Sequence, residues 1–111
     1  AMPCVGGKHA DFMLHGRKIE TRDGRCTTAD GTLAGSAIDM ATAVRNCVKL
    51  LEMPLPDALR LASRTPAGFL GVNDRLGRIA AGYRADLVAF QPEDVQVTAT
   101  WVAGEHASYS D

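Results

Sequence analysis

The hydrophobic pattern of the chain changes period twice, and this order constrains the fold more than any other feature. Around the hairpin dipeptide Asp23-Gly24, residues 12–27 alternate apolar and polar side chains, which is typical of a β-meander. From residue 36 to residue 71, apolar side chains recur at three- and four-residue steps, which indicates amphipathic helices. Residues 87–109 return to strand patterns. The sequence of strands, helices and strands predicts an α/β fold.

The first helix is expected over Ser36–Leu51. Ser36 is a favourable N-cap, and Asp39, three residues later, completes a Ser-x-x-Asp capping box. The apolar stripe includes Val44, Val48 and Leu51, and Pro54 follows the helix, which should end near Glu52.

Two shorter helices should follow. One is expected over Pro56–Ser63, with proline in its first turn. The other has Thr65 as its N-cap and begins at Pro66. We expect Phe69 and Leu70 to pack inward and Gly71 to end this helix in the left-handed conformation.

The last third of the chain reads as strands separated by turns. Gly77 and Gly82 are expected in turns, and Leu87–Phe90 forms a continuous apolar strand that ends before Pro92. Residues 95–102 alternate cleanly, with Val95, Val97, Ala99 and Trp101 on one face. Residues 105–109 follow a turn at Ala103-Gly104 and should pair back. Neither strand block closes a sheet by itself, so the pattern fits part of a composite α/β protein.

Composition narrows the classes of partner. The chain has 111 residues, a net charge of −1 and 46% hydrophobic residues, which argues for a globular protein without a nucleic-acid or membrane partner. No apolar run is long enough to span a membrane. Cys4, Cys26 and Cys47 show no CxxC spacing, so we expect buried or half-buried thiols in a reducing compartment. A cytoplasmic location is the expectation.

Residue patterns alone indicate no metal centre and no catalytic residue. His9, His15 and His106 lie in none of the HxH, HExxH or Cys–His spacings. Most aspartates fall in turns, where they cap their own backbone. Asp86 precedes a strand, and we expect its carboxylate to hold the adjacent turn, with Arg84 as a candidate partner.

The stretch "DGTLAGSAIDM", from Asp30 to Met40, is a glycine-containing loop before an expected helix start. Amide groups near Gly31 and Gly35 point where an anion or a carbonyl group can bind. The same pattern also fits a simple turn followed by a helix cap, and spacing alone leaves both interpretations open.

Several stretches together resemble the N-acetylglucosamine-6-phosphate deacetylases, a family of the amidohydrolase superfamily. They are "AMPCVGG", "DGTLAGSAIDMATAVRN", "RLASRTPAGFLG", "GRIAAGYRADLVAF" and "TWVAGE". The fourth stretch is similar to the tails of many amidohydrolases, whereas the second is particular to the deacetylases. The resemblance covers nearly the whole chain in the family's order.

The resemblance implies hydrolysis of N-acetylglucosamine 6-phosphate to glucosamine 6-phosphate and acetate, with a divalent metal, Zn or Fe, in the full-length enzyme. The family's metal ligands, phosphate-binding residues and catalytic Asp precede the stretch that matches "AMPCVGG". We therefore expect a C-terminal fragment that begins just after the catalytic Asp. It would hold no catalytic residue, metal ligand or bound cofactor, and it would be inactive alone.

The resemblance also assigns a site and a domain plan. Residues matching Leu33, Ala34 and Gly35 line the sugar site through backbone atoms, and the full-length enzyme would be a homodimer. Residues 1–11 would follow the last strand of a TIM-like barrel, and residues 30–76 would hold the substrate loop and the terminal barrel helices. Residues 12–29 and 77–111 would be strands of the small β-sandwich domain. Without the rest of the barrel, much of the apolar stripe at Val44, Val48 and Leu51 would be exposed, which favours association.

Two alternatives stay open at this point. The chain resembles, less specifically, the tail of a dihydroorotase-like or imidazolonepropionase-like amidohydrolase. It also fits a non-catalytic β-rich interaction module, which would fold alone as a stable monomer.

Overall fold

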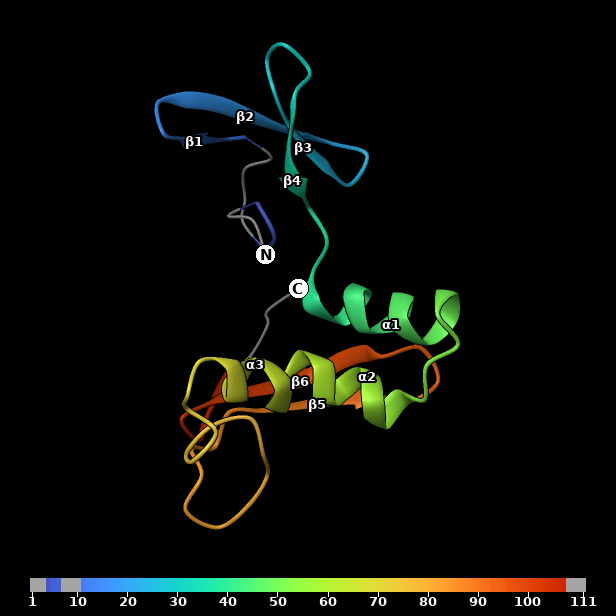
Figure 1. Ribbon diagram of the computed structural model, residues 1–111, viewed down its shortest axis with the longest axis vertical. Helices are drawn as coiled ribbons and strands as arrows, with labels where there is room; N and C mark the ends of the chain where they lie inside the picture. The colour runs from blue at the N-terminus through green and yellow to red at the C-terminus, as the bar shows by residue number, and fades with distance from the viewer. Residues whose placement is uncertain (1–3, 7–10, 108–111) are drawn as a thin grey trace. The chain divides into compact units, whose positions relative to one another are not determined.

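The computed structural model describes residues 4–6 and 11–107 and divides the chain into two compact units, Ala1–Met40 and Ala41–Asp111 (Figure 1). Among the described residues, each unit has its own antiparallel sheet, one of four strands and one of three. The α/β content is therefore confirmed. Membership of the helices in a TIM-like barrel, and of the strands in a β-sandwich, stays a prediction.

The first unit is a β-meander. Its strands β1 (Phe12–Leu14), β2 (Arg17–Arg22), β3 (Arg25–Thr28) and β4 (Leu33–Ser36) lie side by side in sequence order. The β-meander expected before residue 29 is confirmed by β1, β2 and β3, and the fourth strand was not predicted. Because every strand pairs with its neighbour in sequence, short turns alone set the topology.

Three hairpins of the described chain share one turn geometry. The turn dipeptides are His15-Gly16, Asp23-Gly24 and Ala103-Gly104, and both residues of each have positive φ, between 48° and 86°. Two left-handed residues make a type I′ turn, whose twist matches that of the strands it joins. The hairpin predicted at Asp23-Gly24 is confirmed.

The core of the first unit lies on one face of β2 and β3. Ile19 and Cys26 are 1% and 0% exposed. Thr21 pairs directly with Cys26, and Ile19 pairs with Thr28, so these four side chains share a face. A polar hydroxyl therefore lies next to the buried thiol.

The second unit contains the helices α1 (Met40–Leu50), α2 (Leu55–Ala62) and α3 (Arg64–Phe69). The expected start of the first helix at Ser36 is wrong, because Ser36 is the last residue of β4 and pairs with Arg25. Asp39 directly precedes the first helical residue and takes the position expected of Ser36. The Ser-x-x-Asp pattern placed the cap three residues early.

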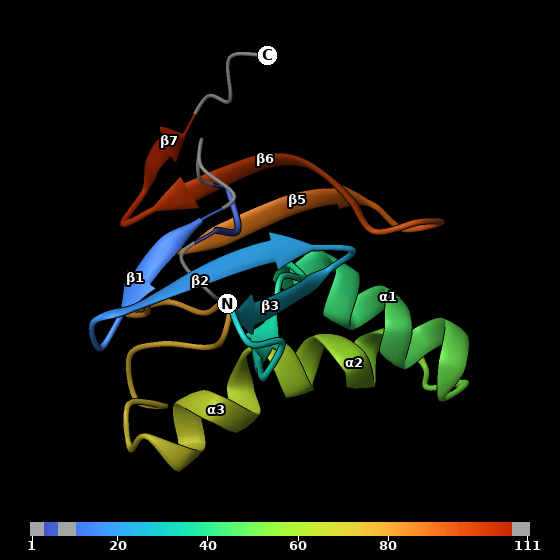
Figure 2. The same ribbon diagram turned by 90° about the horizontal axis from the view of Figure 1, so that it is seen from above.

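The sheet of the second unit consists of β5 (Leu87–Gln91), β6 (Gln96–Val102) and β7 (Glu105–Ala107), again in sequence order (Figure 2). The strand predicted over Leu87–Phe90 is confirmed to within one residue. The predicted return strand is confirmed as far as Ala107, and its remaining residues lie outside the described part of the chain.

The core of the second unit joins α1, α2 and the turn between β5 and β6. Its buried residues are Val44, Ala58 and Val95, and Phe90 of β5 packs against them. Val95 was expected to begin the alternating strand, but it lies in the turn with φ of 55° and its side chain is buried. The guanidinium of Arg45 donates to the carbonyl oxygen of Val95 at 3.1 Å, which ties α1 to this turn.

The apolar stripe of the first helix was expected to be largely exposed, and the structure confirms this for only part of the stripe. Val44 is buried and Val48 packs against the core, so the expectation is wrong for Val44. Leu51 is 68% exposed, as expected. Contacts with α2 and with Val95 suffice to cover one turn of the stripe within this unit.

For the third helix, α3, burial was predicted where the structure shows exposure. Phe69 and Leu70 were expected to pack inward, but they are 90% and 69% exposed in the structure. Six residues give α3 little surface to bury, and its buried residue is Ala67. Gly71 has a φ of 68°, so the predicted left-handed helix end is confirmed.

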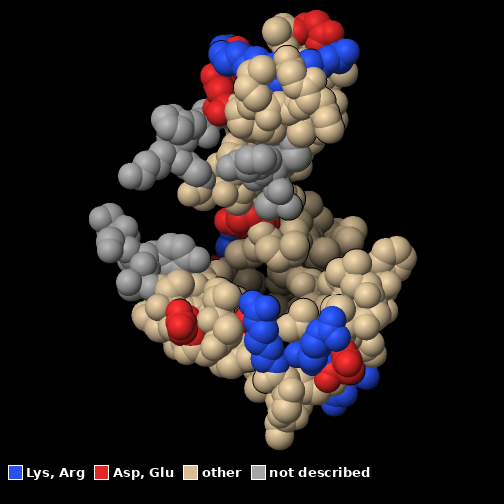
Figure 3. Space-filling model, turned by 90° about the vertical axis from the view of Figure 1, so that its left-hand side faces the viewer, with Lys and Arg blue, Asp and Glu red and all other residues tan. Residues whose placement is uncertain are grey.

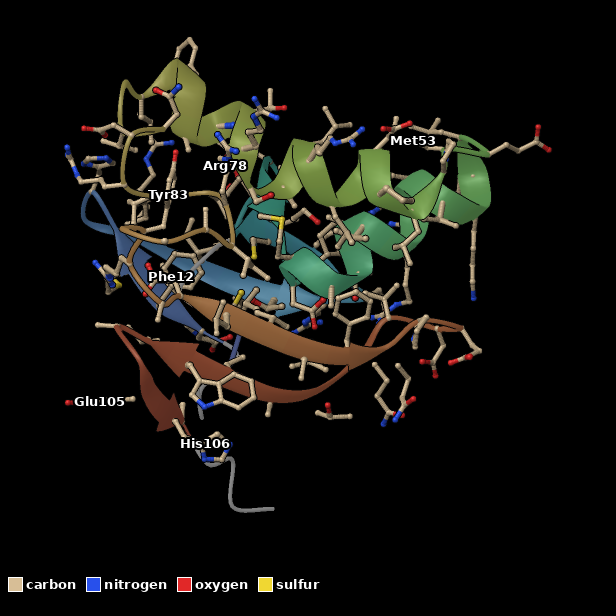
Figure 4. The ribbon with its side chains drawn as sticks, turned by 90° about the horizontal axis from the view of Figure 1, so that it is seen from below. Phe12, Met53, Arg78, Tyr83, Glu105 and His106 are labelled. Atoms are coloured by element: carbon tan, nitrogen blue, oxygen red, sulfur yellow. The ribbon has the colours of Figure 1, made fainter. Side chains whose placement is uncertain are left out.

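The segment after α3 contains turns held by a few side chains. The Tyr83 hydroxyl donates to the carbonyl oxygen of Asn73 at 2.8 Å, and the guanidinium of Arg78 lies 5.5 Å from the centre of the Tyr83 ring (Figure 4). Gly77 and Gly82 have positive φ, as expected of turn residues.

The distribution of charged side chains over the described residues agrees with the net charge of −1. On the face shown in Figure 3, acidic and basic side chains lie near one another in several places, with uncharged surface between them. No helix of the described segments is long and apolar enough to cross a lipid bilayer.

Candidate functional site

The candidate substrate segment forms one arm of the β3–β4 hairpin. The turn between the strands is closed by hydrogen bonds from the Gly31 amide to the Thr28 carbonyl oxygen and from the Thr28 amide to the Thr32 carbonyl oxygen, both at 2.9 Å. Asp30 and Gly31 lie in this turn, and Gly31 has a φ of 84°. The amide of Gly31 is thus bonded to backbone and is not held open for an anion.

Asp30 is fixed within this turn by two threonines. Its carboxylate accepts hydrogen bonds from the Thr28 hydroxyl and, at 3.2 Å, from the Thr32 amide. The Thr28 hydroxyl bond, followed by the bonds from Thr32, lowers the pKa of Asp30 to about 2. The carboxylate therefore stabilises the turn, and a pKa this low makes it a weak general base near neutral pH.

Leu33, Ala34 and Gly35 lie on β4 and not in a loop. Gly35 pairs with Cys26 and Leu33 pairs with Thr27, so Ala34 is an extra residue and β4 has a bulge there. The expectation that these residues form a loop is wrong, because Leu33–Ser36 is a strand that pairs antiparallel with β3. The prediction that these residues bind substrate is untested by this geometry.

The bulge gives the segment features suited to a binding wall. Leu33 is 67% exposed although it is a large apolar residue, whereas Ala34 and Gly35 are half-buried. A bulge leaves one residue outside the regular ladder and changes the direction of neighbouring side chains. Because β4 is also an edge strand of its sheet, one side of its backbone pairs with no strand among the described residues.

Sequence reasoning missed both the strand pairing and the role of the threonines. The pattern Thr-x-Asp-x-Thr at residues 28–32 was the available signal for a turn closed by side chains. The bulge had no clear signal, because small residues such as Ala34 and Gly35 fit a loop as well as an edge strand.

Asp86 has the structural role that was predicted. Its carboxylate accepts hydrogen bonds from Arg84 Nε at 2.9 Å and from the Ala103 amide at 2.8 Å. It therefore joins the segment before β5 to the β6–β7 turn, and the Arg84 partnership is confirmed.

The histidines do not form a metal centre over the described residues. His15 lies in the β1–β2 turn. His106 of β7 (Figure 4) lies beside Trp101, with ring centres 5.3 Å apart and ring planes tilted by 53°. His9 lies outside the described residues. Within residues 4–6 and 11–107, no three His, Cys, Asp or Glu side chains come together as a metal site would require.

Comparison with known proteins places the chain in a family. Residues 20–107 match the model of the Amidohydrolase family. The N-acetylglucosamine-6-phosphate deacetylase of Haemophilus influenzae is 38% identical over 85% of this chain, and the putative N-acetylgalactosamine-6-phosphate deacetylase of Escherichia coli K12 is 36% identical over 98%. The crystal structure of N-acetylglucosamine-6-phosphate deacetylase from Pasteurella multocida matches 98% of the chain with a TM-score of 0.86 and 37% identity.

The matched regions are parts of longer proteins. The chain spans 24% of the H. influenzae relative, 65% of the E. coli relative and 28% of the P. multocida chain. The family model nonetheless covers most of the chain, from within β2 to the end of β7. The chain therefore belongs to the amidohydrolase family.

Proposed function

We propose that the chain is part of a metal-dependent hydrolase that converts N-acetylglucosamine 6-phosphate to glucosamine 6-phosphate and acetate. The observation that carries the proposal is the match of 98% of the chain to the P. multocida structure, whose protein is named for this substrate. The relatives reported above are named deacetylases, which favours deacetylation over a dihydroorotase-like or imidazolonepropionase-like reaction.

Leu33, Ala34 and Gly35 are the residues that we assign to the substrate. The bulge at Ala34 and the exposure of Leu33 support this role, because they place an apolar side chain and backbone groups at the edge of the sheet. We infer that β4 forms a wall against the sugar and takes no part in the bond-breaking step. A wall of this kind raises affinity by positioning the substrate.

The described residues do not fit the divalent metal, Zn or Fe, that the family resemblance implies. No group of three suitable ligands exists among them, and Asp30 and Asp86 are both committed to turns. We infer that other segments of the whole enzyme bind the metal and activate the water. No step of hydrolysis is therefore assigned to a side chain of this part of the molecule.

A second substrate is supported by one observation. The E. coli relative, of which this chain spans the larger share, is named for N-acetylgalactosamine 6-phosphate. The two sugars differ only in the configuration of one hydroxyl group, and both carry the acetamide and the phosphate. The direct test uses the whole polypeptide encoded by the gene that contains this sequence. It measures how much acetate that polypeptide releases from each sugar. Release from neither sugar would contradict the proposed function.

The wall itself is tested by Leu33→Asp in that polypeptide. The new carboxylate would repel a sugar phosphate, so KM should rise about tenfold with little change in stability, since Leu33 is 67% exposed. Met13→Asp is the matched control, because Met13 is 66% exposed on β1, the opposite edge strand of the same sheet. Equal KM values for the two variants would remove Leu33 from the substrate site.

Assembly and location stay predictions. The resemblance implies a homodimer of the full-length enzyme, and composition favours a cytoplasmic protein with neither nucleic acid nor membrane as partner. The alternative of a non-catalytic module predicts a stable monomer with a cooperative melt, which differential scanning calorimetry on the 111-residue chain can detect.

A further inference from the structure

Two cysteines of the first unit lie close together although they are far apart in sequence. The Sγ atoms of Cys4 and Cys26 are 3.4 Å apart, and the Thr21 hydroxyl lies 3.6 Å from the Cys26 sulfur. All three cysteines are free thiols, and Cys47 lies on α1 in the other unit. Cys26 is buried in the strand core, whereas Cys4 is half-exposed.

The separation is small enough for a covalent bond. A disulfide has a sulfur–sulfur distance of about 2.05 Å, so the two atoms need to approach by about 1.4 Å. Cys26 is held by strand pairing on both sides, with Thr21 and with Gly35. Cys4 precedes β1 and is not part of a described strand, so no strand pairing holds its backbone.

We propose that Cys4 and Cys26 are a redox modification site, which a peroxide converts reversibly to an intramolecular disulfide. The Cys4 thiolate attacks hydrogen peroxide: an S–O bond forms, the O–O bond breaks, and hydroxide leaves as water after protonation. The Cys26 sulfur then attacks the sulfenic sulfur: the S–S bond forms, the S–O bond breaks, and the departing hydroxide takes up the Cys26 thiol proton and leaves as a second water. Sulfur is oxidised and peroxide oxygen is reduced, and a dithiol reductant reverses the reaction.

The surroundings assign different roles to the two thiols. The hydrogen bond from the Thr21 side chain lowers the pKa of Cys4, whereas burial raises the pKa of Cys26. The half-exposed thiol is therefore the one that reacts with the oxidant, and the buried thiol resolves the sulfenic acid. Neither thiol is assigned to the substrate, so this proposal does not depend on the deacetylase function.

The test treats the 111-residue chain with hydrogen peroxide under native conditions, blocks the remaining thiols with an alkylating agent and maps the peptides by mass spectrometry. We expect a Cys4–Cys26 cross-link and a decrease in free thiols from three to one, with recovery of all three after reduction. Cys47→Ser should form the same cross-link. Cys4→Ser should leave Cys26 unmodified, since its thiol is buried.

Two outcomes would overturn the proposal. One is a predominance of links to Cys47 under native conditions, which would indicate random pairing; oxidation in urea supplies the reference for such pairing. The other is further oxidation of Cys4 while Cys26 stays reduced, which would show that the thiols do not meet. Thr21→Val should slow cross-linking near neutral pH, and an unchanged rate would contradict the assignment of Cys4 as the attacking thiol.

Discussion

Gly77 lies where the segment after α3 passes the start of that helix. A Cβ atom at this position would lie 2.9 Å from Ala67 Cβ and 3.1 Å from the carbonyl oxygen of Ser63. Gly77 also has a φ of 85°, which side-chain-bearing residues rarely adopt. Close approach and backbone conformation therefore both require glycine here.

Gly77→Ala should lower the free energy of unfolding by about 3 kcal/mol, since steric overlap adds to the left-handed backbone penalty. The control is Gly82→Ala: its φ is 84°, but no atom lies within 4 Å of the added methyl group, so only about 1–2 kcal/mol should be lost. Urea denaturation measures both values. Equal losses would show that contact with α3 is unimportant.

The turn carboxylate of Asp30 should titrate with a pKa of about 2, below its ordinary value of 3.8. Because the folded-state pKa is depressed, the contribution of Asp30 to stability is complete above pH 3.8 and is lost as the pH falls toward 2. NMR titration of the side-chain carboxyl carbon measures this pKa directly.

Thr28→Val removes the main cause of that shift and should return the pKa of Asp30 toward its ordinary value. Thr27→Val, on the adjacent residue, is the control and should leave the titration in place. A pKa unaffected by the Thr28 substitution would mean that the hydroxyl does not hold the carboxylate in solution.

At the scale of secondary-structure elements, the end of α1 offers a stabilising substitution. Glu52 is exposed and has a φ of 51°, two residues after the last residue of α1. Glu52→Gly should raise the free energy of unfolding by about 1 kcal/mol, because glycine adopts this conformation without strain. Lys49→Gly, within the same helix, should lower it by about 1 kcal/mol. Thermal melts that show the same sign for both variants would contradict this account.

Elements whose ends carry strong local signals could be predicted from the sequence. Asp23-Gly24, Gly71 and Pro92 fix a hairpin, a helix end and a strand end through backbone conformations that only a few residue types adopt. Strand β4 could not be predicted, because its four residues have weak β propensity and form a strand only through pairing with β3. Ser36 thus looked like a helix cap.

Burial was harder to predict than secondary structure, because it depends on contacts between distant segments. Val95 is buried through packing with Val44 and Ala58, although its left-handed backbone is unusual for a β-branched residue. Phe69 has the right spacing for an inward-facing residue, yet no described element of the second unit covers it. Likewise, the family resemblance predicted Leu33, Ala34 and Gly35 as candidate site residues, whereas only the structure revealed the bulge in this strand.

At the scale of the whole molecule, the exposed apolar side chains predict self-association. Phe69 and Ile79 are each 90% exposed, and further large apolar side chains on the described surface are Leu50, Leu51 and Leu70. Burial of one such side chain in an apolar contact is favourable by about 1.5–3 kcal/mol relative to its exposure to water. Sedimentation velocity on the 111-residue chain should therefore show concentration-dependent association.

Phe69→Lys should weaken this association by about tenfold or more, since it removes a large apolar surface and adds charge. Thr98→Lys is the control for the added charge, because Thr98 is an exposed polar residue of β6. If both lysine variants shift the equilibrium equally, charge alone is responsible and the apolar surface is not the contact.

The nearest-neighbour order of the strands has a consequence for folding speed. Each pairing in both sheets joins consecutive strands, and three of the turns contain only two residues. Closing such short loops requires little entropy loss, and isolated hairpins form within roughly 1–10 μs. The sheets can therefore assemble hairpin by hairpin from local segments, and their formation should be limited by side-chain packing and not by a search for distant partners.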